Sequence, residues 1–219
     1  MMHNFQVAID GPAGSGKSTI SKKVCDLLGF THIDTGAMYR AVTLEALNRG
    51  IDLTDPNAYG FLEEIEISYE KDKIILNGKS VGREIRSTRV SNNVSTVASI
   101  GYVRRKMVEL QQKAAETGLI VMDGRDIGYV VLPNADVKIF LTASIEERVK
   151  RRYKEIIEAG KDEKYSDILE NIKQRDFKDS NREINPLRQA SDAILLDTTN
   201  MTIDEVVDAI VKIIKKRLD

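Results

Sequence analysis

A short apolar run followed at once by a glycine-rich loop is the feature that most constrains this chain. Phe5–Ile9 reads as a strand, and the next residues, DGPAGSGKST at positions 10–19, match the pattern G-x-x-x-x-G-K-S/T. Glycines in such a loop let successive backbone N–H groups converge on phosphate oxygens, and a following helix adds the positive end of its dipole. The sequence therefore predicts a strand, a nucleotide phosphate-binding loop and a helix that starts at Lys17.

The motif also assigns roles within the loop. Lys17 is expected to reach the β- and γ-phosphates, and Ser18 is expected to ligate Mg²⁺. Asp123 ends a later apolar run and is the candidate for holding the ion through water, although a structural cap of a helix or turn is the alternative. The predicted ATP-binding residues are Gly11, Pro12, Ala13, Gly14, Ser15, Gly16, Lys17, Ser18 and Thr19.

Five apolar runs separated by helical patterns indicate the fold class. Runs that are apolar on nearly every residue are typical of parallel strands covered on both faces. The alternation predicts an α/β fold with a doubly wound, five-stranded parallel sheet. The predicted strands are Phe5–Ile9, Thr31–Asp34, Leu119–Met122, Val137–Leu141 and Ala193–Leu196.

Helix boundaries carry clear signals. Ser144 with Glu147, and Thr202 with Glu205, form two capping boxes. Glycines at 29, 50, 118 and 160 predict helix ends. The predicted helices are 17–28, 37–50, 90–117, 145–160, one that starts near 166, and one that follows 202 and ends in basic residues.

One segment departs from the βα alternation. Residues 65–81, IEISYEKDKIILNGKSV, alternate in places and contain turn signals at Lys71-Asp72 and Asn77-Gly78. This pattern predicts a small antiparallel meander. We expect a P-loop core at 1–37 and 106–219 and an inserted acceptor-binding domain at 38–105.

Composition narrows the classes of partner. The chain has 219 residues, and its 33 Lys and Arg against 34 Asp and Glu give a net charge of −1. No overall basic field attracts nucleic acid or a membrane surface, so an anion site has to be local. No apolar run approaches the roughly 18 residues of a membrane span, and we expect no secretory signal. With Cys25 as its only cysteine, we expect a reduced, cytoplasmic protein in which this thiol is packed.

Arginines follow the second and third predicted strands. DTGAMYR (34–40) and DGRDIG (123–128) bring Arg40 and Arg125 to the sheet edge that holds the loop, where open α/β sheets bind ligands. A guanidinium binds a phosphate with two parallel hydrogen bonds, so an anionic acceptor facing the donor fits this edge. Surface ion pairs are the alternative for each arginine.

A second group of arginines lies within 146–182. It predicts a lid that carries cations onto the transferring phosphoryl group and excludes water. Two solvated helix faces are the alternative interpretation. The group consists of Arg148, Arg151, Arg152, Arg175 and Arg182.

Several separated motifs agree with one family. DGPAGSGKST, DTGAMYR, DGRDIGYVVLPNADVKIFL and the late RD…D..NR resemble the bacterial cytidylate kinases, which are nucleoside monophosphate kinases. The resemblance covers essentially the whole chain and includes the inserted meander. It implies transfer of the γ-phosphoryl group of ATP to CMP or dCMP with Mg²⁺, by a monomer.

The resemblance also implies residue roles. Thr35, Arg40, Arg125 and Arg182 are expected around the acceptor phosphate, Asp179 at the ribose, and Ser95, Arg104 and Asp126 at the cytosine. Thr35 stands where serine is common, Arg105 competes with Arg104 for the base, and Tyr129 replaces a small polar residue. The predicted catalytic residues are Lys17, Arg125, Arg148, Arg152, Arg175 and Arg182.

Other P-loop proteins are the competing hypotheses. The N-K-x-D motif of GTP switches is absent. A kinase of UMP, AMP or a small metabolite, a tRNA dimethylallyl transferase, and an ATPase module that drives a partner stay open. Measuring ATP hydrolysis with and without CMP separates a kinase from an ATPase. A phosphate acceptor needs no general base, and we expect His3 and His32 to be structural or exposed.

Overall fold

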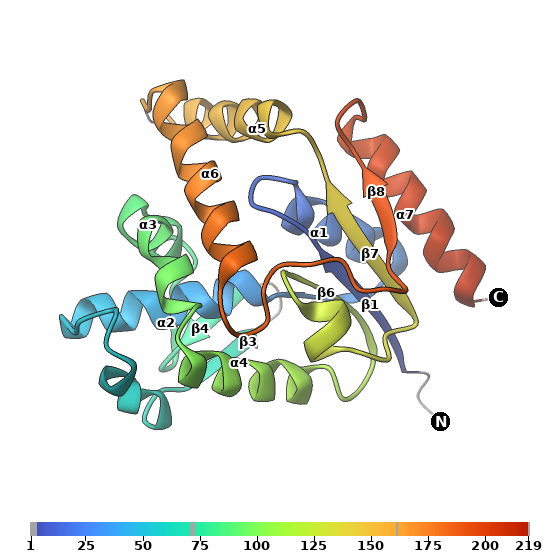
Figure 1. Ribbon diagram of the computed structural model, residues 1–219. Coiled ribbons are helices and arrows are strands. Elements are labelled where there is room, and N and C mark those ends of the chain that lie inside the picture. The colour runs from blue at the N-terminus through green and yellow to red at the C-terminus, as the bar shows by residue number, and fades with distance from the viewer. Residues whose placement is uncertain (1–3, 71–72, 161, 219) are drawn as a thin grey trace.

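A five-stranded parallel sheet forms the centre of the molecule (Figure 1). The computed structural model describes residues 4–70, 73–160 and 162–218. The strands lie in the order β2-β6-β1-β7-β8, and all four neighbouring pairs are parallel. This confirms the predicted doubly wound sheet. The strands are β1 Phe5–Asp10, β2 Thr31–Asp34, β6 Leu119–Gly124, β7 Val137–Thr142 and β8 Ile194–Asp197.

Helices cover both faces of this sheet. On one face, α1 and α7 pack on Val7, Ile9 and Ile139; on the other, Ile33 and Met122 lie beneath α4 and η3. The helices are α1 Lys17–Leu28, α2 Thr35–Arg49, α3 Thr88–Val97, α4 Gly101–Ala114, α5 Ile145–Glu158, α6 Tyr165–Asn181 and α7 Ile203–Leu218. Shorter helical turns are η1 Pro56–Glu63, η2 Glu84–Arg86 and the π-helical η3 Ile127–Val131.

Ser144 and Thr202 of the two predicted capping boxes both begin helices, but only the box at α7 is reciprocal, because the Ser144 amide donates to Thr199 Oγ1 and not to Glu147. The Ser144 hydroxyl accepts a hydrogen bond from the Glu147 amide at the start of α5. At α7, the Thr202 hydroxyl accepts from the Glu205 amide, and the Glu205 carboxylate accepts from the Thr202 amide over 2.8 Å. The bounds of α1 agree with the prediction at both ends.

The predicted single helix over 90–117 is wrong, because the structure has two helices there. Helix α3 is capped by Ser87 and ends at Val97, and Ile100 has extended backbone angles (φ −69°, ψ 119°) before α4 starts. Gly101 packs closely under Ile184, since a Cβ atom at Gly101 would lie 2.8 Å from Ile184 Cδ1. Gly101 thus lies against a distant segment at the start of α4, a contact that helical periodicity does not reveal.

The predicted meander is present as a three-stranded antiparallel sheet of β3 Ile67–Glu70, β4 Lys73–Leu76 and β5 Lys79–Ser80. Asn77 and Gly78 both have positive φ (50° and 73°), as a two-residue hairpin turn requires. The turn predicted at Lys71-Asp72 lies outside the described residues. The division into core, insert and lid stays a prediction.

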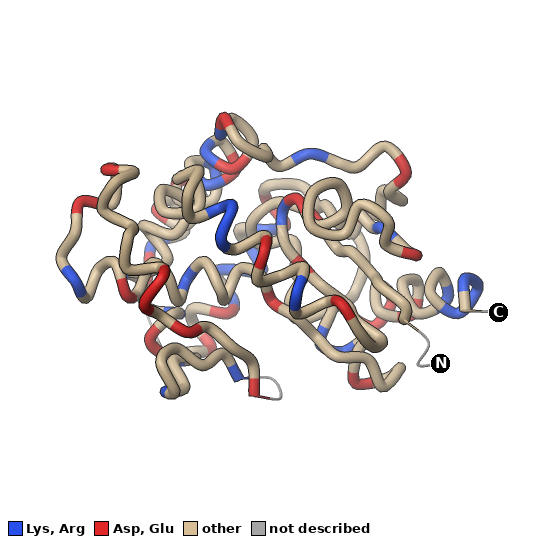
Figure 2. The backbone as a smooth tube through the Cα atoms, turned by 90° about the horizontal axis from the view of Figure 1, so that it is seen from below, with Lys and Arg blue, Asp and Glu red and all other residues tan. Residues whose placement is uncertain are grey.

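Charges of both signs are distributed along the whole chain (Figure 2). This agrees with the near-zero net charge, so anion binding depends on local groups of arginines. No helix within the described ranges has the length and apolar character needed to cross a membrane.

Candidate active site

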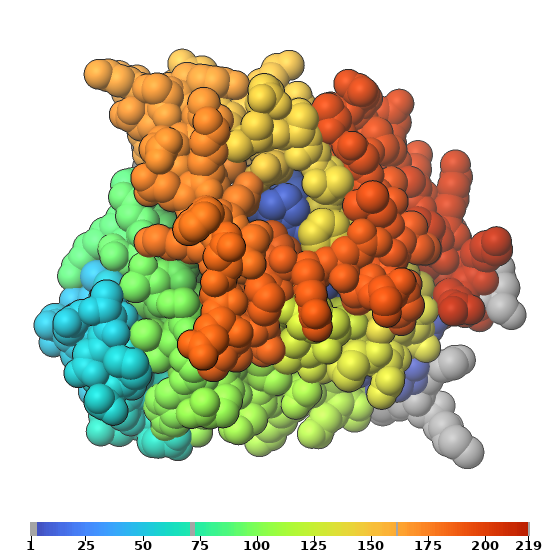
Figure 3. All heavy atoms as spheres, in the orientation of Figure 1, coloured from blue at the N-terminus to red at the C-terminus, as the bar shows by residue number. Residues whose placement is uncertain are grey.

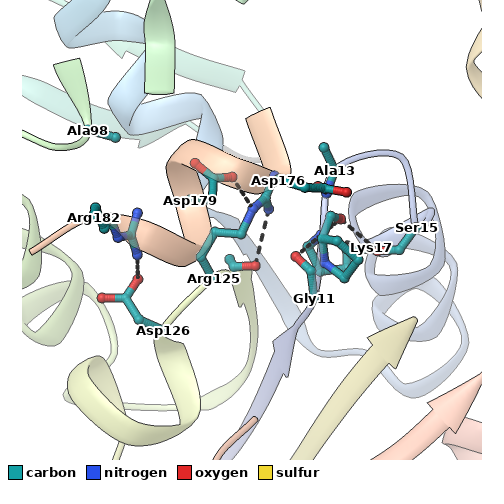
Figure 4. A network of polar contacts seen from close by, with 12 residues as sticks. Gly11, Ala13, Ser15, Lys17, Ala98, Arg125, Asp126, Asp176, Asp179 and Arg182 are labelled. Carbon is teal, nitrogen blue, oxygen red and sulfur yellow. Dashed lines mark hydrogen bonds and ion pairs between the residues drawn. The ribbon is translucent and has the colours of Figure 1, made fainter. Parts of the chain in front are cut away.

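The glycine-rich loop between β1 and α1 wraps around the ammonium group of Lys17 (Figure 4). Lys17 Nζ donates to the carbonyl oxygens of Gly11 and Pro12, each over 2.8 Å. A Cβ atom at Gly11 would lie 2.0 Å from the carbonyl oxygen of Leu141, so only glycine fits there. Burial, and then the charge of Arg125, lower the pKa of Lys17 well below its ordinary value. The predicted contact of Lys17 with the β- and γ-phosphates stays a prediction.

The start of α5 and the middle of α6 hold the loop from outside. Arg148 Nη1 donates to the carbonyl oxygen of Ala13 over 2.8 Å and to the carboxylate of Asp176 over 2.5 Å. The Asp176 carboxylate also accepts from the Ala13 amide over 3.1 Å. Arg148 and Asp176, which pair with each other, therefore hold both backbone polar groups of one loop residue, Ala13. Arg148 contacts the loop backbone directly, and its predicted catalytic role stays a prediction.

Asp123 lies at the end of β6, beside the first turn of α1. Its Oδ2 accepts from the Ser18 hydroxyl over 2.8 Å, and its Oδ1 lies 2.6 Å from His32 Nε2. The Thr35 hydroxyl donates to the Asp123 carbonyl oxygen over 2.7 Å. The structure thus brings together the two predicted metal-associated residues, Ser18 and Asp123. The half-buried His32, expected to be structural or exposed, orients this carboxylate.

A pocket opens beside the loop, at the carboxyl ends of β2 and β6. It is bounded by α2, α3, the residues that follow β6, and α6. Arg104 was also predicted to bind the acceptor. It lies beneath this pocket, with 1% of its surface exposed. Among the residues that line the pocket are Thr35, Arg40, Ser95, Arg125, Asp126, Asp179 and Arg182.

Asp126 is held between two buried arginines at one end of the pocket. Arg104 Nη2 donates to Asp126 Oδ2, and Arg182 Nη2 donates to Oδ1 over 3.3 Å (Figure 4). Arg104 Nη1 also donates to the Ala98 carbonyl oxygen over 3.2 Å, whereas the neighbouring Arg105 is exposed. The geometry therefore favours Arg104 over Arg105 as the residue that acts with Asp126.

At the other end of the pocket lie the guanidinium groups of Arg40, Arg125 and Arg175. Arg125 donates from Nε to Asp179 Oδ2 over 2.9 Å, and Arg40 donates to the Ser91 hydroxyl over the same distance. Among the described residues, the buried Arg175 Nε has no hydrogen-bond partner. Burial, and then repulsion from Arg175, lower the pKa of Arg40 to about 9, and burial with repulsion from Arg125 lowers that of Arg175 to about 10. This end of the pocket therefore concentrates positive charge, as the prediction of an acceptor phosphate requires.

Other lid arginines differ in what they contact. Arg152 lines a second cleft together with Arg175 and Arg86, between α3 and α6. Arg151 instead donates to the Thr198 carbonyl oxygen over 2.7 Å, near the end of β8. Figure 3 shows part of the N-terminal segment, in blue, at the bottom of a hollow between yellow and orange segments. The loop is therefore reachable from this side.

Several residues of the site were not singled out from the sequence. Asp176 precedes the predicted Asp179 by one helical turn, a spacing that places both on one face of α6. Tyr129, whose meaning was open, donates to the Pro186 carbonyl oxygen, and Arg188 lies 4.3 Å from the centre of its ring. Tyr129 thus anchors the loop that follows Arg182. Asp10, buried at the end of β1, had no assigned role.

Comparison with known families decides the identity of this site. Residues 7–216 match the family model described as cytidylate kinase. The chain belongs to the cytidylate kinase family. It is 52% identical over 214 residues to a cytidylate kinase of Acholeplasma laidlawii (98% of this chain, 96% of the relative). It is 50% identical over 221 residues to one of Shouchella clausii (99% and 98%).

Solved structures show the same fold at low identity. A gluconokinase from Sinorhizobium meliloti has a TM-score of 0.51 at 13% identity, covering 99% of this chain and 94% of that one. Protein TT1252 from Thermus thermophilus has a TM-score of 0.50 at 16% identity, covering 99% of both chains. As a member of the cytidylate kinase family, the chain is an enzyme that transfers phosphoryl groups, which confirms the family and enzyme class predicted from the sequence.

Proposed function

We propose that the chain transfers the γ-phosphoryl group of ATP to CMP or dCMP, giving ADP and CDP or dCDP, in a reaction that depends on Mg²⁺. The observation that carries this proposal is the position of Arg125. Arg125 lies close enough to Lys17 in the loop to lower its pKa, and it pairs with Asp179 in the pocket. One guanidinium thus faces both the donor loop and the acceptor pocket. This is the position needed to stabilise the phosphoryl group during its transfer.

Charge explains why the site contains so many cations. Donor and acceptor phosphates repel each other, so their approach requires positive charge between them. Half-buried Arg40 and Arg175 have lowered pKa values because removal of the guanidinium from water disfavours its charge and neighbouring guanidiniums repel it. Bound phosphate would relieve that repulsion. A phosphate oxygen is already anionic and can attack without a general base, so catalysis consists of positioning and electrostatic stabilisation.

The residues beside the loop fit the magnesium ion. Ser18 Oγ and Asp123 Oδ2 lie 2.8 Å apart, and Mg²⁺ prefers oxygen ligands. Within the described ranges, no group of three or more His, Cys, Asp or Glu side chains could hold a metal. This agrees with an ion bound chiefly by nucleotide phosphates, a hydroxyl and water. When bound, Mg²⁺ would neutralise charge on the phosphates.

The pair Arg104 and Asp126 fits cytosine. A carboxylate accepts from the cytosine amino group and repels the carbonyl oxygen that uracil has at the same position. Arg104 lies beneath the pocket and donates to Asp126 and to the Ala98 carbonyl oxygen, so its proposed part in base recognition is to hold the Asp126 carboxylate in place. We further propose that the protein acts as a monomer in cytoplasmic pyrimidine nucleotide metabolism.

A panel of acceptors tests the proposal. Phosphoryl transfer from ATP would be measured with CMP, dCMP, UMP and AMP, with Mg²⁺ and with EDTA, and ATP hydrolysis without acceptor would be the control. We expect CDP and dCDP to form rapidly only with Mg²⁺. Equal use of UMP or AMP, or ATP hydrolysis that needs no acceptor, would overturn the proposal.

A further inference from the structure

The last residue of β1, Asp10, is buried next to the acceptor pocket and contacts no residue that we assign to substrate. Its side chain reaches across the sheet edge to the turn that follows β6. Asp10 Oδ1 accepts from the Ile127 amide and Oδ2 accepts from the Gly128 amide, each over 2.8 Å. These amides belong to the first turn of η3, where helical N–H groups have no partner within the helix.

A cap of this kind is ordinarily supplied by the residue that precedes the helix. Here that residue is Asp126, with φ −145° and ψ 24°, and its side chain makes no capping hydrogen bond. Both Asp126 oxygens instead accept from Arg104 and Arg182. Because Asp10 of β1 caps η3, the Asp126 carboxylate is not needed as the helix cap and can face the pocket.

The space around Asp10 is shaped for this contact. A Cβ atom at Gly128 would lie 3.3 Å from Asp10 Oδ2 and 3.4 Å from Lys138 Cδ, so glycine permits the close approach of the amide. Lys138 directs its ammonium away, to the Pro133 carbonyl oxygen and Asp192. The charged groups that act on Asp10 are Asp126 and Lys17.

We propose that Asp10 is a positioning residue for acceptor recognition, which caps η3 in place of Asp126 and so presents the Asp126 carboxylate to the acceptor base. The proposal rests on the proposed function, because Asp126 is the base-reading group there. It predicts that substitution of Asp10 lowers the discrimination between CMP and UMP, although Asp10 itself does not contact the base.

The test compares kcat/KM for CMP and UMP in the wild type and in Asp10→Asn. The asparagine keeps the size but places an NH₂ group against one backbone N–H. We expect the CMP-to-UMP ratio to fall about tenfold, the scale of one lost hydrogen bond to a charged group, while KM for ATP stays within about twofold. Asp136→Asn is the matched control. The Asp136 carboxylate accepts from the amide of Gln6 over 2.8 Å, and Gln6 lies in the same strand as Asp10. This contact is far from the pocket, so the ratio should not change.

A pH profile separates positioning from a merely structural role. Burial, opposed by the two amides, raises the pKa of Asp10 to about 6. The wild-type CMP-to-UMP ratio should therefore decrease as pH falls through about 6, and the Asp10→Asn ratio should be low and constant. Phosphate titration is common to both nucleotides and cancels in the ratio. If Asp10→Asn does not fold, Gly128→Ala, whose added Cβ would lie 3.3 Å from Asp10 Oδ2 and so press on the same contact, should lower the ratio in the same direction.

An unchanged ratio in a folded Asp10→Asn or Gly128→Ala variant would overturn the proposal. A wild type without preference for CMP would contradict the proposed function instead. In that case KM for the preferred acceptor, measured against KM for ATP, still tests Asp10. A rise confined to the acceptor supports positioning, and equal changes for both substrates overturn it.

Discussion

Arg125 and Asp179 form a 2.9 Å ion pair that joins the end of β6 to α6. Burial alone would raise the pKa of Asp179, but Arg125 and then Arg175 lower it below the ordinary value. The pair therefore stays charged at neutral pH and fixes the guanidinium between donor loop and acceptor pocket.

Removing the Asp179 charge should leave Arg125 without its anchor. We expect Asp179→Asn to raise KM for CMP and lower kcat, by about ten- to a hundredfold in kcat/KM, since a buried guanidinium loses a charged partner. Steady-state kinetics would measure both constants. Glu63→Gln, which weakens the exposed pair with Lys106, is the matched control and should leave them unchanged. A normal KM for CMP in Asp179→Asn would contradict this role.

Lys17 should contribute chiefly to the chemical step. Its ammonium donates only within the loop, so Lys17→Ala should fold, with a loss in kcat of about 10²–10⁴ or about 3–5 kcal/mol. Single-turnover kinetics would measure the rate, and circular dichroism would report folding. A folded variant with near-normal turnover would exclude Lys17 from phosphoryl transfer.

The lid prediction concerns 146–182. Helices α5 and α6 share a small apolar cluster of their own, and Arg148 links α5 to the loop. Hydrogen exchange in α5 and α6 should slow when ATP and CMP analogues bind together. Helix α7, which packs on the sheet core through Ile210 and Ile214, is the internal control and should not change. Slowing in α7 alone would leave the lid arginines as surface charge.

The features that the sequence predicted correctly are those determined by residues close together along the chain. The loop, the five strands and the helix starts at Ser144 and Thr202 each depend on neighbouring residues, so short patterns predicted them. The reciprocal bond predicted from Glu147 to the Ser144 amide was wrong, because that amide donates to Thr199 of a distant segment. The acceptor residues came from motif resemblance, and the structure gathers seven of them around one pocket. Their substrate roles stay predictions.

The residues that were missed act through contacts between distant segments. Gly101 at the start of α4 packs against Ile184 of a distant segment, and the Asp123 carboxylate lies within hydrogen-bond distance of His32 from another strand. Asp10 lies next to the loop motif, yet its partners Ile127 and Gly128 are 117 and 118 residues away along the chain. No periodicity within one element reveals such pairs.

Two neighbouring arginines provide a sharp test of base recognition. Arg104 is buried against Asp126, and Arg105 is exposed. Arg104→Lys should reduce kcat/KM for CMP by about tenfold or more, because one ammonium cannot replace the donors of a guanidinium fork. Arg105→Lys is the matched control and should behave as wild type. Asp126→Asn should shrink the CMP-to-UMP preference by about tenfold, because its amide can donate to uracil. Equal effects of the two lysine variants would contradict the assignment of Arg104.

The buried Asp10 makes a prediction for stability as well. Its pKa is about 6 in the folded protein against an ordinary value of 3.8. Between these values the folded state binds the extra proton, so the Asp10 contribution to the free energy of unfolding falls as pH rises through that window. A shift of about 2 units corresponds to about 3 kcal/mol. Urea unfolding of wild type and Asp10→Asn at several pH values would show it. The stability of the wild type minus that of the variant should decrease between about pH 4 and pH 6 and then level off. A difference that stays constant, or that grows with pH, would mean that Asp10 carries its charge at no cost to folding.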